Sequence, residues 1–224
     1  MTSSTNESPA TKPLFAILLA FVGAFLYIAF AQKNEISISN LSMLLGGFLV
    51  VVGGYSVAKP KEVGQALRAF PRANAPGYVL MLAATAWFLW NIHTEEMEDY
   101  KDIKHLFYLG FGLVGIGSCV YLRDFLAVRG MAVFMLLLAR LILDTQRIYM
   151  FDTPVETMSQ WRLIFAIWGY AIVLMSMWMI ISPWRMRDMI HWLTAEPSRL
   201  RIKGGFRLFL GLLLIVLGLT VFRV

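Results

Sequence analysis

The chain has 224 residues, of which 58% are hydrophobic and only 15% are charged, with a net charge of +6. About a quarter of the residues of soluble domains are charged, so this composition excludes an ordinary soluble protein. A single cysteine, Cys119, excludes an internal disulfide and a thiolate metal cluster. We interpret Cys119 as a small packing residue and not as a reactive thiol.

Seven apolar runs follow one another along the chain, each close to the length that crosses a membrane. In lipid the backbone must satisfy its own hydrogen bonds, so runs of this length are predicted to be helices. The sequence therefore predicts an all-α, polytopic membrane protein with a cytoplasmic tail over residues 1–13 and one bundle over 14–222. Seven transmembrane helices are expected near residues 14–31, 41–58, 77–92, 106–122, 131–150, 163–182 and 205–222.

The first run ends on a pattern that resembles a signal-peptidase site. Ala29 and Ala31 flank Phe30, and Lys12 precedes the apolar stretch as in a signal peptide. The run is longer than a cleaved apolar region usually is, so we predict that the helix is retained. Cleavage after Ala31, the alternative, would leave six helices and the same threading for the rest.

The basic residues are unevenly distributed between the two sides of the predicted bundle. With the tail and the even-numbered loops in the cytoplasm, five cationic residues lie outside and 13 inside: Lys12, Lys59, Lys61, Arg68, Arg72, Arg123, Arg129, Arg185, Arg187, Arg199, Arg201, Lys203 and Arg207. The positive-inside rule then predicts a cytoplasmic N-terminus and an external C-terminus in a bacterial inner membrane. This bias accounts for the basic balance, so we predict no nucleic-acid partner.

Two of the cytoplasmic loops are predicted to form amphipathic elbows, over residues 60–71 and 183–197. Each opens with a proline, Pro60 or Pro183, at a natural first helical position, and closes on a second proline. Apolar residues recur on one face of each elbow, as in Val63, Leu67 and Phe70 of the first. We expect both elbows to lie flat at the membrane surface and to contact lipid headgroups.

The similarity of the elbows suggests an internal repeat. Runs 2–3, 4–5 and 6–7 would form three parallel helix hairpins, with run 1 added in front. The alternative is that hairpins that obey the positive-inside rule look alike without being related.

The last of these hairpins carries a family resemblance. Over residues 179–221 the order is Pro183-Trp184, an amphipathic stretch, Glu196-Pro197, Leu200-Arg201, and Gly204-Gly205 before a final helix. In this order it resembles the YjeT-like small inner-membrane proteins, a family of unknown function. The resemblance covers less than a fifth of the chain, implies the hairpin architecture only, and brings no catalytic residues.

Glycines recur at intervals of seven residues within three of the runs. The pairs are Gly46/Gly53, Gly47/Gly54, Gly110/Gly117 and Gly211/Gly218. Seven residues are nearly two turns, so each pair lies on one helix face. Small residues on such a face let another helix approach closely in lipid. We predict helix contacts at these glycines, either within the chain or with another subunit.

Three charged residues interrupt the fifth run, in the stretch LLLARLILDTQR. Spacings of four and three residues place Arg140, Asp144 and Arg147 on one stripe. Counted from Gly130 at 1.5 Å per residue, Arg140 is expected at the middle of the core, where charge is costly. The stripe has three interpretations: an internal ion pair, a spare positive charge that meets a partner's carboxylate or an anionic lipid, or the lining of an anion or proton route.

The remaining polar residues indicate no catalytic or cofactor site. The loop between His93 and His105 is rich in carboxylates, but its spacing matches no tight metal pattern. The last run has no lysine for a retinal Schiff base, and the chain has no phosphate loop or dinucleotide fingerprint. We therefore predict no enzyme, no metal and no cofactor.

These observations favour an accessory or scaffold subunit of a membrane complex. Its partners would be the lipid bilayer and another membrane protein, with a homo-oligomer as the other form of association. The alternative function is a small transporter or channel with a polar path lined by Arg140 and Asp144.

Overall fold

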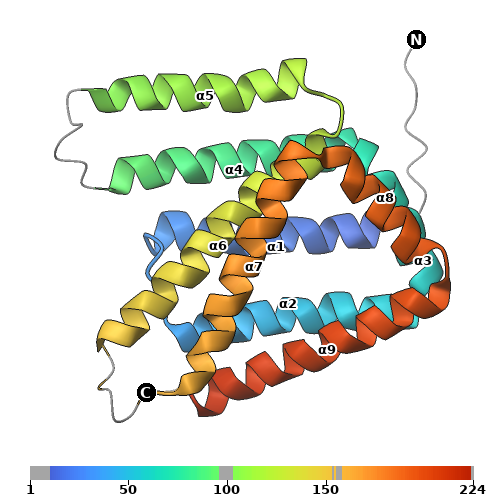
Figure 1. Ribbon diagram of the computed structural model, residues 1–224. Coiled ribbons are helices and arrows are strands. Elements are labelled where there is room, and N and C mark those ends of the chain that lie inside the picture. The colour runs from blue at the N-terminus through green and yellow to red at the C-terminus, as the bar shows by residue number, and fades with distance from the viewer. Residues whose placement is uncertain (1–10, 96–102, 153, 155–157, 223–224) are drawn as a thin grey trace.

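The chain folds into a bundle of α-helices in the computed structural model, which describes residues 11–95, 103–152, 154 and 158–222 (Figure 1). No strand occurs among these residues, so the all-α prediction is confirmed for the described chain. Of the predicted tail, residues 1–10 lie outside the described residues. The helices are α1 (Thr11–Ala31), α2 (Ile38–Ala58), α3 (Pro60–Ala69), α4 (Asn74–Thr94), α5 (Lys104–Tyr121), α6 (Leu126–Asp152), α7 (Leu163–Ile181), α8 (Pro183–Thr194) and α9 (Pro197–Thr220), with 3-10 turns η1 (Phe70–Arg72) and η3 (Gln160–Arg162).

Six of the described helices are long and apolar enough to cross a membrane: α1, α2, α4, α6, α7 and α9. These helices mark the chain as a multi-pass membrane protein. The count is one fewer than predicted, and the helix that falls short is α5. α5 has 18 residues, which is about the shortest length that crosses a membrane. Its first two residues, Lys104 and His105, are polar and lower its mean hydropathy.

The closest helix pair in the bundle joins α2 to α9 in antiparallel orientation. A Cβ atom added at Gly46 would lie 2.7 Å from the carbonyl oxygen of Gly211, and one added at Gly53 would lie 2.7 Å from the amide nitrogen of Leu208. The Ser42 hydroxyl donates a 2.6 Å hydrogen bond across the same contact to the Leu214 carbonyl. Glycine is required here because any side chain would separate the two backbones.

We call this contact the α2–α9 seam. The predicted glycines fall into two groups, those that lie in the seam and those that do not. Gly46, Gly53, Gly211 and Gly218 all lie in the seam, within the chain. Gly47, Gly110 and Gly117 have no neighbour within 4 Å of an added Cβ, and Gly54 has only a side-chain atom at 3.9 Å. The prediction of helix contacts is therefore not met within the described chain at Gly47, Gly110 and Gly117, whereas Gly54 has an ordinary contact with the Leu208 side chain of α9.

The three predicted hairpins do not form separate pairs. α2 packs most extensively on α9, α4 on α6, and α6 on α7, whereas α5 packs on α4 and not along α6. The hairpin grouping is wrong because close glycine contacts join helices that are distant in sequence. Gly77 of α4 contacts Ala127 of α6, and Gly130 of α6 contacts Met81 of α4.

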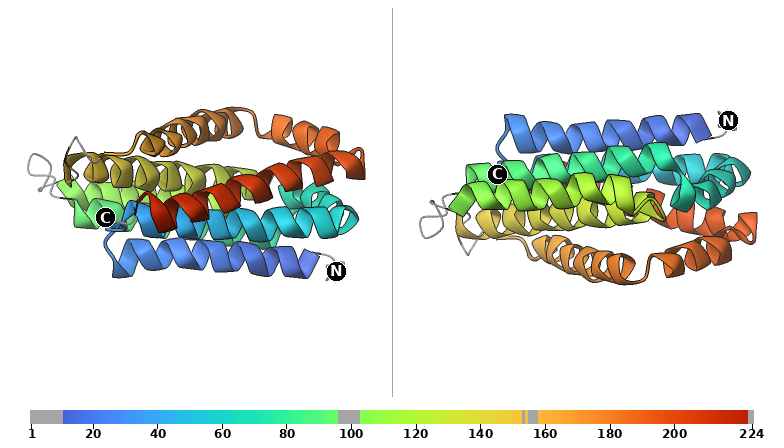
Figure 2. Two further views of the ribbon diagram at one scale, coloured as in Figure 1. Left: turned by 90° about the horizontal axis from the view of Figure 1, so that it is seen from below. Right: turned by 90° about the horizontal axis from the view of Figure 1, so that it is seen from above.

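An aromatic cluster fills the centre of the bundle, with α1 and α7 on its opposite outer faces (Figure 2). Phe25, Trp87, Phe134 and Phe165 are fully buried. The Phe25 ring stacks on Trp87 at 6.3 Å, and Phe134 meets the same indole edge-on at 5.3 Å. The cluster joins α1, α4 and α6, so α1 forms part of the core.

The two predicted elbows are helices α3 and α8, and they pack against each other. Val63 of α3, Leu193 of α8 and Leu200 of α9 form a buried apolar cluster. The apolar faces of the elbows therefore point partly toward protein, and the contact with lipid headgroups stays a prediction.

One polar contact fixes the first elbow to the end of α2. The Tyr55 hydroxyl donates a 2.8 Å hydrogen bond to Glu62, whose carboxylate also pairs with Lys59 at 3.0 Å. The hydrogen bond from Tyr55, followed by that from Lys59, lowers the pKa of the Glu62 carboxyl. The ionised carboxylate thus holds α3 at a turn of the chain directly after a candidate span.

The seam yields a matched pair of substitutions. Gly53→Ala places a methyl group 2.7 Å from backbone atoms of α9, so we expect it to lower the free energy of unfolding by about 1–3 kcal/mol. Gly47→Ala, on the same helix, meets open space and should be neutral or slightly stabilising. Thermal unfolding in mild detergent measures both, and equal midpoints for the two variants would contradict the seam.

Candidate functional site

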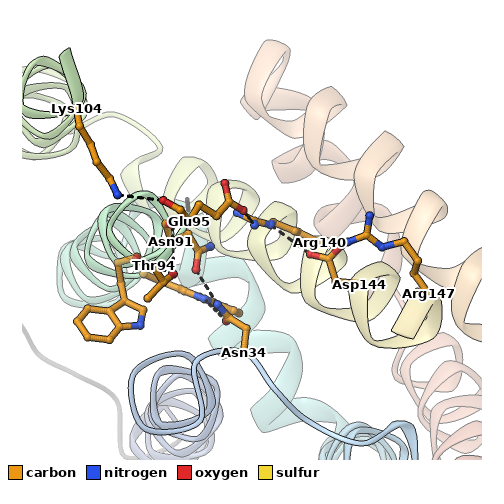
Figure 3. A network of polar contacts seen from close by, with 10 residues as sticks. Asn34, Asn91, Thr94, Glu95, Lys104, Arg140, Asp144 and Arg147 are labelled. Atoms are coloured by element: carbon orange, nitrogen blue, oxygen red, sulfur yellow. Dashed lines mark hydrogen bonds and ion pairs between the residues drawn. The ribbon is translucent and has the colours of Figure 1, made fainter. Parts of the chain in front are cut away.

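Arg140, Asp144 and Arg147 of α6 form an ion-pair network with a residue of another segment (Figure 3). Asp144 forms ion pairs with both arginines, with Arg140 Nε 3.4 Å from Oδ2 and Arg147 Nη2 3.3 Å from Oδ1. Arg140 also pairs with Glu95, the residue after α4. Two guanidinium groups thus face two carboxylates, and the spare positive charge, which one of the three interpretations assigned to a partner or a lipid, is met within the chain.

The network lies near the end of the bundle where α4 ends, and not at mid-core. α4 and α6 begin side by side, where Gly77 contacts Ala127, and run in the same direction. α6 has 27 residues and α4 only 21, so α6 continues beyond α4. The side chains of Arg140 and Asp144 are 41% and 40% exposed. Arg140 therefore lies close to the level of the end of α4 in the bundle, and its depth in a membrane stays a prediction.

A second set of polar contacts joins the loop after α1 to α4. The Asn34 amide donates to Asn91 Oδ1 at 2.9 Å, and its oxygen accepts from Trp87 Nε1 at 3.1 Å. Asn34 has a φ of 63°, a left-handed conformation that asparagine tolerates better than most residues. The side chain thereby satisfies the polar nitrogen of a fully buried indole.

The site residues predicted from the sequence did not include Asn34, Trp87, Asn91 or Glu95. The available signal was Asn91, a polar amide inside an apolar run. Its partners come from segments distant in sequence, so their pairing could not be read from spacing.

Together the two sets line a recess of about 300 Å³. Its polar lining comes from the loop after α1, the end of α4 and the last half of α6: Lys33, Asn34, Glu35, Asn91, Thr94, Glu95, Arg140, Asp144 and Arg147. Its apolar lining includes Trp87, Leu137 and Leu141, which are all buried. The recess therefore ends on the aromatic cluster and does not continue through the bundle among the described residues.

The chemistry of this recess is that of paired charges. Its described lining contains no serine, cysteine or histidine that would supply a nucleophile–base pair. Among the described residues no group of three or more His, Cys, Asp or Glu side chains could hold a metal ion. The arrangement can fix α4, α6 and the α1–α2 loop to one another, and can accept a small polar group.

The beginning of α5 is tied to the same end of α4. Lys104 Nζ donates to the carbonyl oxygens of His93 and Glu95, each at 3.0 Å. The Tyr108 hydroxyl lies 3.3 Å from His93 Nδ1. The other carboxylates of this acidic loop, Glu96, Glu98, Asp99 and Asp102, lie outside the described residues.

Comparison with family models, curated proteins and solved structures gives no match for this chain. The resemblance of residues 179–221 to the YjeT-like proteins therefore stays a prediction.

The role of Asn34 can be tested against its neighbour. Asn34→Gly keeps the left-handed backbone but leaves Trp87 Nε1 and the Asn91 amide without their partner. We expect a loss of about 1–3 kcal/mol in the free energy of unfolding. Lys33→Gly, at a φ of 50°, should be neutral or stabilising, because the Lys33 side chain makes no hydrogen bond to the residues that the structure describes. Thermal unfolding followed by tryptophan fluorescence distinguishes them, and an unaffected Asn34→Gly would contradict the structural role.

The Arg140–Glu95 pair is testable by a double-mutant cycle. Since both side chains are almost half exposed, we expect a coupling of only about 0.5–1 kcal/mol between Arg140→Gln and Glu95→Gln. Glu95→Gln combined with Arg199→Gln, at the opposite end of the bundle, should be additive. Equilibrium unfolding measures the coupling energy in both cycles. Equal coupling energies in the two cycles would show that Arg140 and Glu95 do not interact specifically.

Proposed function

We propose that this chain is a non-enzymatic accessory or scaffold subunit of a membrane complex, and that α5 is its seventh transmembrane helix. α4 ends at one end of the bundle, whereas α6 begins at the other, beside the first turns of α4. α5 runs between these two ends alongside α4 (Figure 1). Because α5 runs alongside α4, which is itself a candidate span, its position supports a count of seven transmembrane helices.

The observation that carries the proposal is the outward face of α5. Among the described elements, α5 packs extensively only on α4. There Gly115 lies against Thr85, and Phe111 meets Phe88 edge-on at 4.7 Å. The opposite side carries Gly110 and Gly117, neither with a neighbour within 4 Å of an added Cβ.

A single open glycine, such as Gly47, can face lipid, but Gly110 and Gly117 form a pair two turns apart on one helix face with no neighbour at either position. Glycine inside a helix costs about 0.5–1 kcal/mol relative to alanine, and a lipid tail gains nothing from the missing side chain. A second helix does gain, because it can approach the backbone closely, as α9 approaches α2 at the seam. We therefore assign the Gly110/Gly117 face to a helix of another membrane protein.

The transporter or channel alternative has less support. A route would need polar groups beyond Arg140, but the recess ends on Leu137, Leu141 and Trp87. Arg140 itself is paired with Glu95 and Asp144. These features fit a structural network better than a conducting path.

The orientation and membrane are also part of the proposal. The N-terminal end of α1 and both elbows lie at one end of the bundle, and the C-terminus lies at the other (Figure 1). The cation-rich end would face the cytoplasm of a bacterial inner membrane, by the positive-inside rule. We propose that α1 is retained, since its removal would take away Phe25 and uncover Trp87, the indole on which Phe25 stacks.

Affinity purification in mild detergent with native mass spectrometry tests this function. We expect a stoichiometric membrane partner with the wild-type chain and its loss with Gly110→Leu/Gly117→Leu, because the added side chains block close helix approach. Gly47→Leu, which also enters open space but on α2, should keep the partner. Recovery of a lone monomer or a closed homo-oligomer from the wild type would refute the subunit role.

A further inference from the structure

The two elbows enclose a second recess, at the end of the bundle opposite the Arg140 network. It has a volume of about 580 Å³ and is lined by Arg68, Pro71, Arg72, Arg187, Asp188 and His191. Three guanidinium groups and one carboxylate leave a net charge of +2 in this lining with His191 neutral. We call it the elbow recess.

The geometry of the elbow recess is built into the contact between α3 and α8. Arg68 donates from Nε to Thr194 Oγ1 at 2.7 Å and from Nη2 to the Thr194 carbonyl at 2.6 Å. Thr194 is buried, and its hydroxyl in turn donates to the Ile190 carbonyl at 2.8 Å. Pro71, which also lines the recess, is fully buried. The Arg68 guanidinium is thus held in place between the elbows before any ligand arrives.

The charges of the recess are only partly compensated. Asp188 is the single carboxylate of the lining, and it is occupied by Arg187, with Oδ1 3.0 Å from Nη2. Arg68 uses Nε and Nη2 for Thr194, so its Nη1 remains available. Arg72 has no acceptor among the residues that the structure describes. These two groups leave donors for one more anion.

The position of the recess restricts the source of that anion. η1 leads directly into α4, and α8 follows directly on α7, both of which are candidate spans. Trp184 and Trp192 are exposed on α8, and exposed tryptophans beside spans are typical of the headgroup level. The anions that are concentrated at this level are the phosphate groups of lipids.

We propose that the elbow recess binds the phosphate group of an anionic lipid headgroup, with Arg72 and Arg68 as donors. Guanidinium groups match phosphate oxygens in geometry as well as in charge. Basic pockets between spanning helices are suited to anionic headgroups, and the volume lies within the range of about 300–1,000 Å³ usual for small-ligand sites. The site is independent of the α5 face and of any protein partner.

Lipid binding to the full chain in nanodiscs tests the proposal. The probe is phosphatidylglycerol in a phosphatidylcholine bilayer, with the lipids retained by the protein counted by native mass spectrometry. Arg72→Gln should weaken phosphatidylglycerol retention about fivefold, which corresponds to roughly 1 kcal/mol per basic side chain near an anionic surface. Arg185→Gln, which removes a cation of the other elbow that lies outside the recess lining, is the control and should change little.

The outcomes separate a lipid site from two alternatives. An equal effect of Arg72→Gln and Arg185→Gln would mean a diffuse surface attraction and would overturn the site. Displacement of phosphatidylglycerol by millimolar inorganic phosphate would identify a soluble anion as the ligand and overturn the lipid source. Retention that survives phosphate and falls only with Arg72→Gln supports the proposal.

Discussion

Contact between the backbones of α2 and α9 is the constraint on which the rest of the bundle depends. Gly46, Gly53 and Gly211 bring the two helices to a separation that no side chain allows, and Ser42 adds a hydrogen bond across it. Because α3 follows α2 and α8 precedes α9, this antiparallel contact places the two elbows side by side. The Arg68–Thr194 bonds and the elbow recess are consequences of that placement.

The parallel contact of α4 with α6 organises the opposite end. Because α4 and α6 are parallel, α5 must run back along the bundle between them in the chain. It packs on α4, and its opposite face with Gly110 and Gly117 contacts no other described residue within 4 Å of an added Cβ. The parallel contact also directs the end of α4 toward α6, where Glu95 meets Arg140. One recess is therefore balanced in charge and the other is basic, and each results from a packing contact between helices distant in sequence.

Much of the fold could be predicted from the sequence, because spanning a membrane imposes length and hydrophobicity on each segment. The positions of the helices, the two elbows, and the pairing of Arg140 with Asp144 one turn away all follow from local rules. Helix partners do not, since Gly46 and Gly47 are equivalent in sequence and only the arrangement of α9 distinguishes them. The pairing of Arg140 with Glu95 could not be predicted for the same reason: it depends on where α4 ends, and Glu95 is 45 residues away.

Disulfide cross-linking across the seam tests the central claim most directly. An ideal Cβ at Gly218 lies 3.2 Å from Cβ of Ser42, close to the separation of about 3.5–4.5 Å in disulfides. In a Cys119→Ala background, Ser42→Cys with Gly218→Cys should oxidise to a cross-linked monomer, whereas Gly47→Cys with Gly218→Cys should remain reduced. Cross-linked dimers, or equal oxidation of both pairs, would show that α2 and α9 of one chain are not joined as described.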